Sequence, residues 1–409
     1  MGEKAVWGIL RAGLKRMKIL YLIPMDIWTE PWAIRALKIC ENLCARGHEI
    51  TLFYFWNQGK RIGSPIILHT LLDGMAIKTF PLWNVWDDTF SPRLFMRVLG
   101  DIRSIARNAD LIHLQKALPW AALPAVLASR LENKPLHYDW DDNEAEIASE
   151  YAPPLLTAEI RLYEMLLPCV ANTISVSTMG LKKKLLRLGF PGDRVFDAPV
   201  GADLLVFHPA RKGHTVKERF KLRTNVVLYM GQLEWGSYAE LFIDCYPQVA
   251  REVGDVSFLV VGGGEKLDGL KQKAERLDTS GGIVFTGYVN REVVADYVSC
   301  CDVAVACFAD NEITRCKSPL KIAEYMAAGK AIVASDVGDI PRMLGGSGIL
   351  ARPGDVNDLA NKIVLILKDG ALRDALGNEA RRRAELIYNW KNTTKSIEQA
   401  YERAIRDRR

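Results

Sequence analysis

The chain has 409 residues, of which 49% are hydrophobic and 25% are charged, and its formal net charge is +5 at pH 7. This length predicts two domains, and this composition is typical of a soluble globular protein. No uncharged apolar run reaches about eighteen residues, and the N-terminus lacks the apolar core of a secretory signal, so we expect neither a membrane-spanning helix nor a signal peptide. The mild positive charge suggests anionic surfaces or phosphates as neighbours and does not indicate nucleic acid.

The eight cysteines do not form a metal-binding set. Cys40 and Cys44 could face one another on a helix, but no second pair of Cys or His completes a zinc site, and Cys300-Cys301 is not a metal-ligand spacing. We therefore expect reduced, mostly buried thiols and a cytoplasmic protein.

The first half of the chain alternates short β-rich runs with helical patterns, which is typical of a parallel sheet with crossover helices. Helices are predicted at 32–46 and at 92–107. The predicted strands are 18–23, 49–55, 75–80, 111–114, 136–138 and 173–176.

The second half repeats this alternation and ends in a helix over 393–406, which has one apolar face. Its predicted strands are 226–230, 257–261, 283–285, 303–306 and 331–334. The polar, basic stretch 206–222 is the predicted linker. The predicted parts are a basic amphipathic extension at 1–16, a first domain at 17–205, the linker, a second domain at 223–390, and a C-terminal helix at 391–409 that packs back on the first domain.

The segment 315–329 predicts an anion site at a helix N-terminus. Ser318 suits the N-cap and Pro319 the first helical position. The free amides of Leu320 and Lys321 and the positive end of the helix dipole would then face a cleft and could bind a diphosphate. The cations of this segment are Arg315, Lys317 and Lys321.

Glu324 follows one and a half turns into the same helix, where its two acceptor oxygens could bind a ribose diol. The alternative is an ordinary capped helix whose charges are solvated.

The order and spacing of several segments resemble glycosyltransferase family 4, the large retaining family with the GT-B fold. In the second half the matching segments are 261–264, 285–289, 324–329, 331–338 and 348–355; in the first half they are 43–52, 174–177, 201–203 and 207–209. The resemblance implies an α/β protein with two Rossmann-like, doubly wound parallel-sheet domains facing across a cleft. It also implies transfer of a sugar from a nucleoside-diphosphate sugar to an acceptor hydroxyl, with retention.

Carried over by this resemblance, Glu324 binds the ribose hydroxyls, Tyr288 and Val289 line the base, and the turn around Gly263 lies beside the nucleotide. That turn, 262–264, could instead be a simple strand-to-helix turn. The predicted nucleotide, diphosphate and sugar contacts are Glu324, Leu320, Ser318, Arg315, Cys316, Glu312, Gly231, Gly263, Tyr288 and Val289.

The chain departs from the family pattern around the sugar and the diphosphate. Cys316 stands where the family has the first Glu of its Glu-x7-Glu motif, so the sugar is recognised differently or by Glu312. The Ser-Pro-x-Lys pattern of 318–321 resembles a branch of the family. The run 231–236 lacks the family's Arg and Lys, so Lys321, Lys317 or Arg315 would stabilise the leaving group; Lys321 and Lys317 are the predicted catalytic cations.

A third departure lies in the run 137–142, His-Tyr-Asp-Trp-Asp-Asp. By register Asp141 takes the place of the family's active-site His and is a predicted catalytic residue, with Asp139 on the acceptor side. An Asp-x-Asp pair could alternatively hold a divalent ion, or these acids could cap the next helix. We expect metal-independent chemistry, because two facing Rossmann domains supply a positive diphosphate site.

Two tryptophans after the first strand, Trp28 and Trp32, are candidates for an acceptor pocket, with the hydrophobic core as the alternative.

Basic amphipathic patterns over 1–16 and 92–107 suit an anionic bilayer surface, although a helix packed on its own domain explains them equally. Peripheral attachment at the cytoplasmic face would suit a glycan or lipid-linked glycan acceptor in cell-surface polysaccharide or glycolipid assembly. Two other functions stay open, an inactive GT-B scaffold or partner subunit and a sugar-nucleotide epimerase.

Overall fold

The computed structural model describes residues 16–27, 33–57, 75–82, 91–234, 238–277 and 281–408. The predicted N-terminal extension, apart from residue 16, and the acceptor candidates Trp28 and Trp32 lie outside these residues. The chain divides into two units. Unit 1 comprises Met1–Pro199 and Trp390–Arg409, and unit 2 comprises Val200–Asn389.

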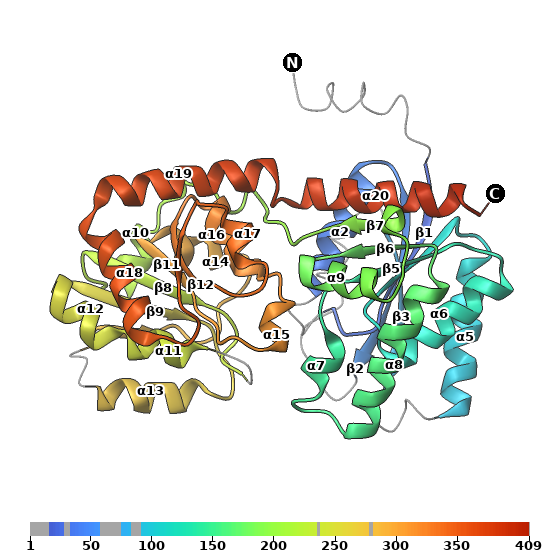
Figure 1. The fold of residues 1–409 in the computed structure, drawn as a ribbon, viewed down its shortest axis with the longest axis horizontal. Coiled ribbons are helices and arrows are strands. Elements are labelled where there is room, and N and C mark those ends of the chain that lie inside the picture. The colour runs from blue at the N-terminus through green and yellow to red at the C-terminus, as the bar shows by residue number, and fades with distance from the viewer. Residues whose placement is uncertain are drawn as a thin grey trace, which may run out of the picture. The chain divides into compact units, whose positions relative to one another are not determined.

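Unit 1 is built on one parallel seven-stranded sheet in the order β3-β2-β1-β4-β5-β6-β7 (Figure 1). Its strands are β1 (Lys18–Ile23), β2 (Glu49–Asn57), β3 (Met75–Leu82), β4 (Leu111–Gln115), β5 (Leu136–Trp140), β6 (Thr173–Val176) and β7 (Val195–Asp197). The central strands are apolar along most of their length because helices cover both faces of the sheet. The strand order reverses between β1 and β4, and ligands of such sheets bind beyond the carboxyl ends of the strands at that point.

The helices of unit 1 include the C-terminal one. They are α2 (Ala33–Ala45), α5 (Pro92–Ala106), α6 (Pro119–Leu131), α7 (Glu144–Ala148), α8 (Pro154–Val170), α9 (Met179–Arg187), the 3-10 turn η1 (Gly192–Arg194) and α20 (Trp390–Arg406). Helix α20 packs on α2 and on β5, β6 and β7, where Ile397 and Tyr401 join the core beside Tyr21. The C-terminal residues therefore complete the hydrophobic core of the unit in which the chain begins.

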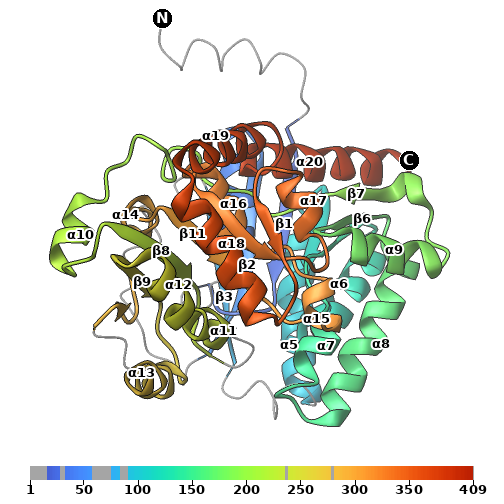
Figure 2. The ribbon, with the colours of Figure 1, turned by 60° about the vertical axis from the view of Figure 1, so that its left-hand side comes forward.

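Unit 2 contains a parallel six-stranded sheet in the order β10-β9-β8-β11-β12-β13 (Figure 2). Its strands are β8 (Asn225–Met230), β9 (Val256–Val261), β10 (Ile283–Phe285), β11 (Val303–Ala306), β12 (Ala331–Ser335) and β13 (Ile349–Ala351). Its helices are α10 (His214–Arg219), α11 (Ala239–Asp244), α12 (Tyr246–Val253), α13 (Leu267–Arg276), α14 (Val294–Ser299), α15 (Glu312–Arg315), α16 (Leu320–Ala327), α17 (Ile340–Leu344), α18 (Val356–Lys368) and α19 (Gly370–Leu386). The prediction of two doubly wound parallel sheets is confirmed.

The predicted linker, 206–222, lies within unit 2. Phe207 is buried in the core of this unit, and Arg381 on α19 donates hydrogen bonds to the backbone oxygens of Leu204 and Phe207. The sequence of this segment is polar because only a few of its side chains face the core. A side chain far away in the sequence, that of Arg381, binds its backbone.

None of the helices that the structure describes combines the length and the hydropathy needed to cross a bilayer.

A buried carboxylate of α20 also binds side chains from the N-terminal part of unit 1. Glu398 accepts hydrogen bonds from His48 Nε2 at 2.7 Å and from Arg46 Nε at 2.9 Å, while His48 Nδ1 accepts from the backbone N–H of Met17. Burial by itself raises the pKa of Glu398, but the hydrogen bonds from His48 and Arg46 outweigh burial and hold this pKa below its usual value of 4.5.

We expect Glu398→Gln to lower the free energy of unfolding at neutral pH by about 1.5–3 kcal/mol, the value of a hydrogen bond to a charged group. Because the folded-state pKa is depressed, the stabilisation is present above the unfolded pKa and is lost as pH falls through the folded one. Urea unfolding near neutral pH and at about pH 4 measures this. The difference between wild type and variant should shrink in acid, and an equal difference at both pH values would contradict the assignment.

Candidate functional site

In unit 2, three loops meet closely at the carboxyl ends of β8, β9 and β10. A Cβ atom added to Gly262 would lie 1.9 Å from the backbone oxygen of Gly231, and one added to Gly263 would lie 3.0 Å from the backbone nitrogen of Tyr288. Gly262 also forms an isolated bridge with Gly287. The glycines are therefore required by close approach of backbones, and they bring the predicted residues Gly231, Gly263 and Tyr288 together beside the strand-order reversal between β8 and β11.

Lys321 lies on the first turn of α16 and reaches this place. Its ammonium lies 4.2 Å from the centroid of the Tyr229 ring, and a Cβ on Gly231 would lie 2.8 Å from its Nζ. Burial lowers the pKa of Lys321 to about 8, so the side chain is mostly protonated at neutral pH. No carboxylate forms an ion pair with Lys321 in the part of the chain that the structure describes. Its ammonium lies over the rings of Tyr229 and Phe308, and Glu324 acts on it without forming an ion pair, so its charge is available to an anion.

Glu324 lies one turn after Lys321 on the same side of α16 and is buried. Its carboxylate is paired with the guanidinium of Arg291, which also lies 5.4 Å from the Phe207 ring. Burial raises the pKa of Glu324, and Arg291 and Lys321 oppose this rise. Arg291 is not predicted from the sequence, because it lies after β10 at no motif spacing from Glu324. A ligand that binds Glu324 has to share it with Arg291 or displace Arg291.

The start of α16 differs from the prediction. The helix begins at Leu320 with Pro319 as its N-cap, and no side chain caps it. The hydroxyl of Ser318 instead accepts a hydrogen bond of 3.4 Å from the backbone N–H of Val200. The expected Ser318 cap is therefore wrong, since Ser318 bonds to a segment distant in sequence. The amide of Leu320 still opens the helix, as expected.

The remaining predicted contacts do not all gather at Lys321. Arg315 is exposed and pairs with Asp310 at 2.7 Å and with Glu312 at 2.9 Å, so acidic neighbours balance its charge. The charge balance argues against Arg315 as a diphosphate ligand. The carboxylate of Glu312, predicted to contact the sugar, is engaged by Arg315. Cys316 is buried, and Tyr288 is 86% exposed, with its ring accessible to a ligand. Of the predicted contacts that remain, Lys317 is partly buried, and Val289 is partly buried against the core of unit 2.

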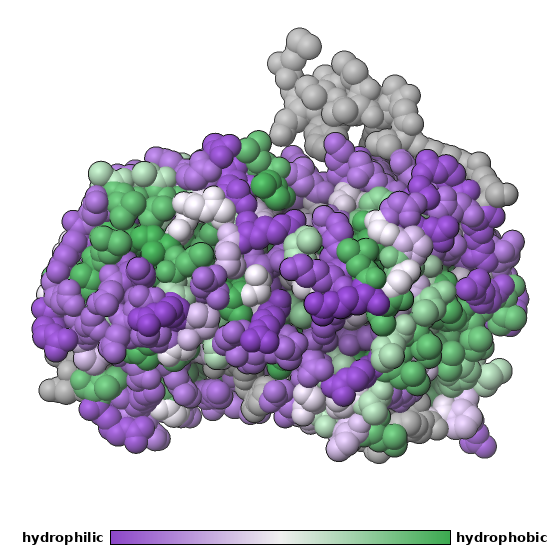
Figure 3. Space-filling view, viewed as in Figure 1, coloured by the Kyte–Doolittle hydropathy of each residue, from purple (hydrophilic) through white to green (hydrophobic). Residues whose placement is uncertain are grey.

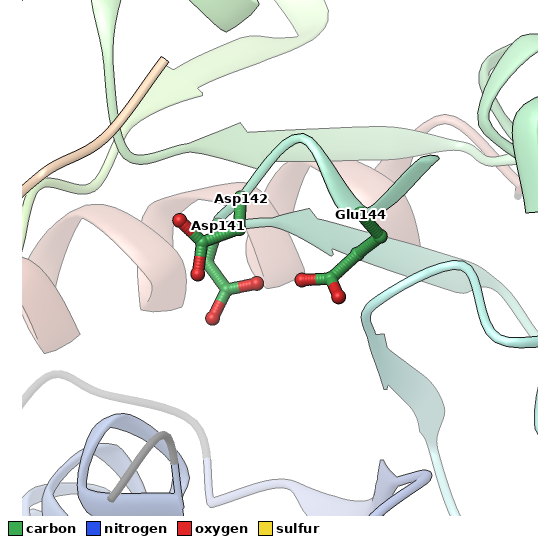
Figure 4. A group of neighbouring side chains, drawn as sticks. All are labelled: Asp141, Asp142 and Glu144. Atoms are coloured by element: carbon green, nitrogen blue, oxygen red, sulfur yellow. The ribbon is translucent and has the colours of Figure 1, made fainter. Parts of the chain in front are cut away.

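In unit 1, a buried lysine follows β4 directly. Lys116 is 1% exposed and adopts a left-handed backbone conformation with φ of 66°, which is uncommon for a residue other than glycine. Its ammonium lies 3.1 Å from Asp141 and 3.4 Å from Asp142, and it pairs closely with Glu144. Figure 4 shows these three carboxylates: Asp141 and Asp142 follow β5, and Glu144 is the first residue of α7. Asp141, Asp142 and Glu144 are thus gathered around one cation.

Burial raises the pKa of Asp141 and brings that of Glu144 to about 7, and the neighbouring carboxylates add to both shifts. Burial alone lowers the pKa of Lys116, but Asp141 and Glu144 raise this pKa well above its usual range. Lys116 therefore stays charged while the acids can share a proton. Lys116 was missed in the sequence, although it follows β4 as Asp141 follows β5, and β4 and β5 are neighbours.

Asp139 is part of a separate, fully buried pair. Its carboxylate accepts hydrogen bonds from Arg35 at 2.7 and 2.8 Å and from the hydroxyl of Ser175, and Arg35 holds the pKa of Asp139 below its usual range despite burial. Asp139 is therefore placed in the core and not on a surface open to an acceptor. Asp141 instead accepts from Gln115 Nε2 at 2.8 Å.

The alternative metal site of Asp139 and Asp141 does not fit these contacts, because Arg35 already engages Asp139. One carboxylate oxygen from each of Asp141, Asp142 and Glu144 lies within 4.8 Å of the others, a spacing that could hold an ion. The ammonium of Lys116 occupies the position of that cation. Metal-independent chemistry remains our expectation.

Residues 224–369 match the family model of glycosyl transferases group 1. Similar curated proteins include an uncharacterised glycosyltransferase of Methanocaldococcus jannaschii, 26% identical over 46% of this chain and 48% of the relative. They also include the phosphatidyl-myo-inositol mannosyltransferase of Mycolicibacterium smegmatis, 28% identical over 57% of each chain. The chain spans about half the length of the curated relatives that it matches, with shares of 48, 50 and 57%.

Solved structures resemble the chain over most of its length. HepE of Anabaena, in complex with UDP and glucose, has a TM-score of 0.75 and 17% identity over 94% of this chain and 99% of its own. WaaG, a glycosyltransferase involved in lipopolysaccharide biosynthesis, has a TM-score of 0.66 and 14% identity over 92% of this chain and 98% of its own. These likenesses show that the fold is GT-B.

Proposed function

We propose that this chain is a group 1 glycosyltransferase that moves a sugar from a nucleoside-diphosphate sugar, bound by unit 2, to an acceptor hydroxyl. The family match of residues 224–369 and the named relatives support a glycosyltransferase. The observation that carries the proposal is Lys321, a cation without a carboxylate partner among the described residues, one helical turn from the buried acid Glu324. Together they offer a positive contact for a diphosphate and a negative contact for ribose hydroxyls on one side of α16.

In this proposal Lys321 and the first amides of α16 bind the diphosphate, Glu324 binds the ribose hydroxyls, and the exposed ring of Tyr288 contacts the base. The bond between the anomeric carbon and the diphosphate oxygen breaks with its electron pair on that oxygen. Lys321 stabilises the growing charge there. The acceptor oxygen bonds to the anomeric carbon, and its proton passes to the departing diphosphate oxygen. Retention of the anomeric configuration is part of the proposal and rests on the family resemblance.

The relatives support the choice of donor and acceptor classes in this proposal. HepE structures contain UDP or UDP-glucose, and the mycobacterial relatives are named as phosphatidyl-myo-inositol mannosyltransferases. We therefore propose a uridine-diphosphate hexose as the first donor to test and a lipid-linked glycan or glycolipid as the acceptor, used at the cytoplasmic face of a membrane. A role in cell-surface polysaccharide or glycolipid assembly is included in this proposal.

The direct test measures nucleotide release with a panel of nucleoside-diphosphate sugars, with and without lipid acceptors, after thermal shift has identified the donors that bind. A transferase releases nucleotide only when donor and acceptor are both present, beyond slow hydrolysis. Donor binding without any turnover would indicate an inactive scaffold. Conversion of the donor sugar without acceptor would indicate an epimerase. The comparisons do not favour either of these alternatives.

We expect Glu324→Gln to weaken donor nucleotide binding by about 10- to 100-fold, which corresponds to losing charged hydrogen bonds to the ribose. The fold should persist, because the partner left behind, Arg291, is 41% exposed and can be solvated. Isothermal titration with the nucleoside diphosphate measures the loss. Glu292→Gln removes an exposed carboxylate one residue after Arg291 and is the matched control. Equal affinities of wild type and Glu324→Gln would remove Glu324 from the site.

A further inference from the structure

Unit 1 carries a pocket of about 280 Å³, which is lined by side chains of α7, α8, α9 and the end of β5. Asn143 lies at its buried wall, Arg161 and Met165 of α8 line one part, and Lys184 and Arg187 of α9 line another. None of these residues belongs to the nucleotide site proposed above, and the pocket has no assigned role.

The acids of this pocket have partners within unit 1. Glu146 pairs with Arg161 at 2.8 Å. Glu164 is buried, which raises its pKa to about 7, and it accepts hydrogen bonds from Trp140 Nε1 and from the backbone N–H groups that begin α7. By contrast, Lys184 and Arg187 form no hydrogen bond or close ion pair through their side chains in the described part of the chain, although the charge of Lys184 acts on Glu164 and opposes the rise of its pKa. The pocket therefore has an excess of positive charge.

A buried donor without an acceptor lies at the same place. Asn143 stands at the N-cap of α7, but its side chain makes no capping hydrogen bond, because Glu164 already accepts from the amides of Glu144 and Ala145. Asn143 is 3% exposed, and its Nδ2 has no hydrogen-bond partner among the described residues. An unsatisfied buried donor is costly and calls for an oxygen that the chain does not supply.

The rim of the pocket continues into exposed apolar side chains. Met165 and Leu188 line it and are 52% and 47% exposed. Leu162 and Leu166 are also half exposed. Leu162 lies three residues before Met165 and four before Leu166, so the three side chains form one exposed stripe along α8. Figure 3 shows hydrophobic residues gathered over the region of α6 and α8 in unit 1. An anion bound in the pocket would thus have apolar surface directly beside it.

We propose that this pocket binds the phosphoryl group of an anionic lipid, whose apolar chain lies on the exposed residues of α8. Lys184 and Arg187 contact the phosphoryl oxygens as cations, and Asn143 Nδ2 donates to one of them. Free phosphate presents the same oxygens, and only a lipid also uses Leu162, Met165 and Leu166. The proposal does not depend on sugar transfer, because it concerns binding to unit 1 alone.

The test compares sedimentation of the full chain with vesicles of phosphatidylcholine and with vesicles that also contain phosphatidic acid, in matched salt. Inorganic phosphate is titrated separately and followed by thermal shift. Wild type should bind the phosphatidic acid vesicles preferentially. Lys184→Gln and Arg187→Gln should each weaken this binding by about tenfold, more than the roughly fivefold that one cation near an anionic surface contributes by general attraction.

Lys183→Gln is the matched control, since Lys183 is exposed on the same turn of α9 and does not line the pocket. Asn143→Asp places a carboxylate in the pocket and should abolish the preference, with its thermal stability recorded to show that the fold persists. Leu166→Gln should weaken vesicle binding and leave the response to inorganic phosphate unchanged. Equal losses in Lys183→Gln and Lys184→Gln, or no loss in Lys184→Gln and Arg187→Gln, would overturn the pocket. A thermal shift with inorganic phosphate but no sedimentation with vesicles would show that the pocket binds free phosphate and would overturn the lipid as the ligand.

Discussion

Replacing Lys321 by alanine is expected to lower turnover by about 30- to 1000-fold, corresponding to about 2–4 kcal/mol of the activation barrier. The ammonium of Lys321 lies beside Gly231 at the end of β8 and is paired with no carboxylate in the described structure. Negative charge on the diphosphate grows as the sugar bond breaks, so this contact strengthens toward the transition state. Turnover should therefore fall more than donor affinity, as steady-state kinetics and nucleotide titration would measure.

The pKa of Lys321 also predicts how activity depends on pH. Burial lowers the pKa of Lys321 to about 8, so the ammonium is present below that pH and is lost above it. We expect kcat/KM, which reports the free enzyme, to fall as pH rises through about 8. Lys321→Arg should be slower than wild type, because a planar fork does not replace a compact ammonium. It should also lack this alkaline decline, because a guanidinium stays charged.

Two neighbouring cations are the controls for Lys321. Arg315→Ala should change turnover little, because Asp310 and Glu312 already balance that charge. Lys317→Ala tests the other predicted catalytic lysine. A collapse of turnover in Lys317→Ala with normal turnover in Lys321→Ala would assign the role to Lys317. Normal turnover in all three variants would place the diphosphate site elsewhere.

Replacing Lys116 by methionine is expected to lower the free energy of unfolding of unit 1 by about 3–5 kcal/mol, the cost of breaking a buried ion pair on one side only. The variant keeps the volume of the side chain but leaves Asp141 and Glu144 buried without their cation. Asp142, which is 24% exposed, loses the same partner. Urea unfolding with a probe in unit 1 measures the change.

Acid should partly rescue Lys116→Met. Without the ammonium, the folded-state pKa values of Asp141 and Glu144, already raised by burial, rise further. Carboxyls with raised folded-state pKa values stabilise the fold in acid and lose that contribution as pH increases, so the variant should be more stable near about pH 5 than at neutral pH. Lys183→Met, at an exposed site, controls for the loss of one charge. A pH-independent loss would show that packing, and not charge, is what Lys116 provides.

Local pattern determined much of the architecture. The apolar runs of β8, β9 and β12 form continuous buried strands where the sequence placed them, because a strand covered on both faces has to be apolar throughout. The helix that carries Lys321 and Glu324 also follows from its own sequence, since their spacing places both on one side of any helix. These features depend only on residues close together in the chain.

Contacts between distant residues required the tertiary structure. Lys116 meets Glu144 because β4 and β5 are neighbouring parallel strands, Arg35 meets Asp139 across 104 positions, and Arg291 meets Glu324 across 33. Strand order is not written in any local pattern, so no spacing reveals which strand ends lie together. Ser318 shows the same limit. Its position before Pro319 suits a helix cap, but its hydroxyl accepts a hydrogen bond from the backbone N–H of Val200 instead. The sequence by itself determined most of the strands, though not β7 or β13, and the position of Lys321 and Glu324 on one helix. Only the folded chain decided which charge each side chain meets, because electrostatic partners are set by distance in space and not by distance along the chain.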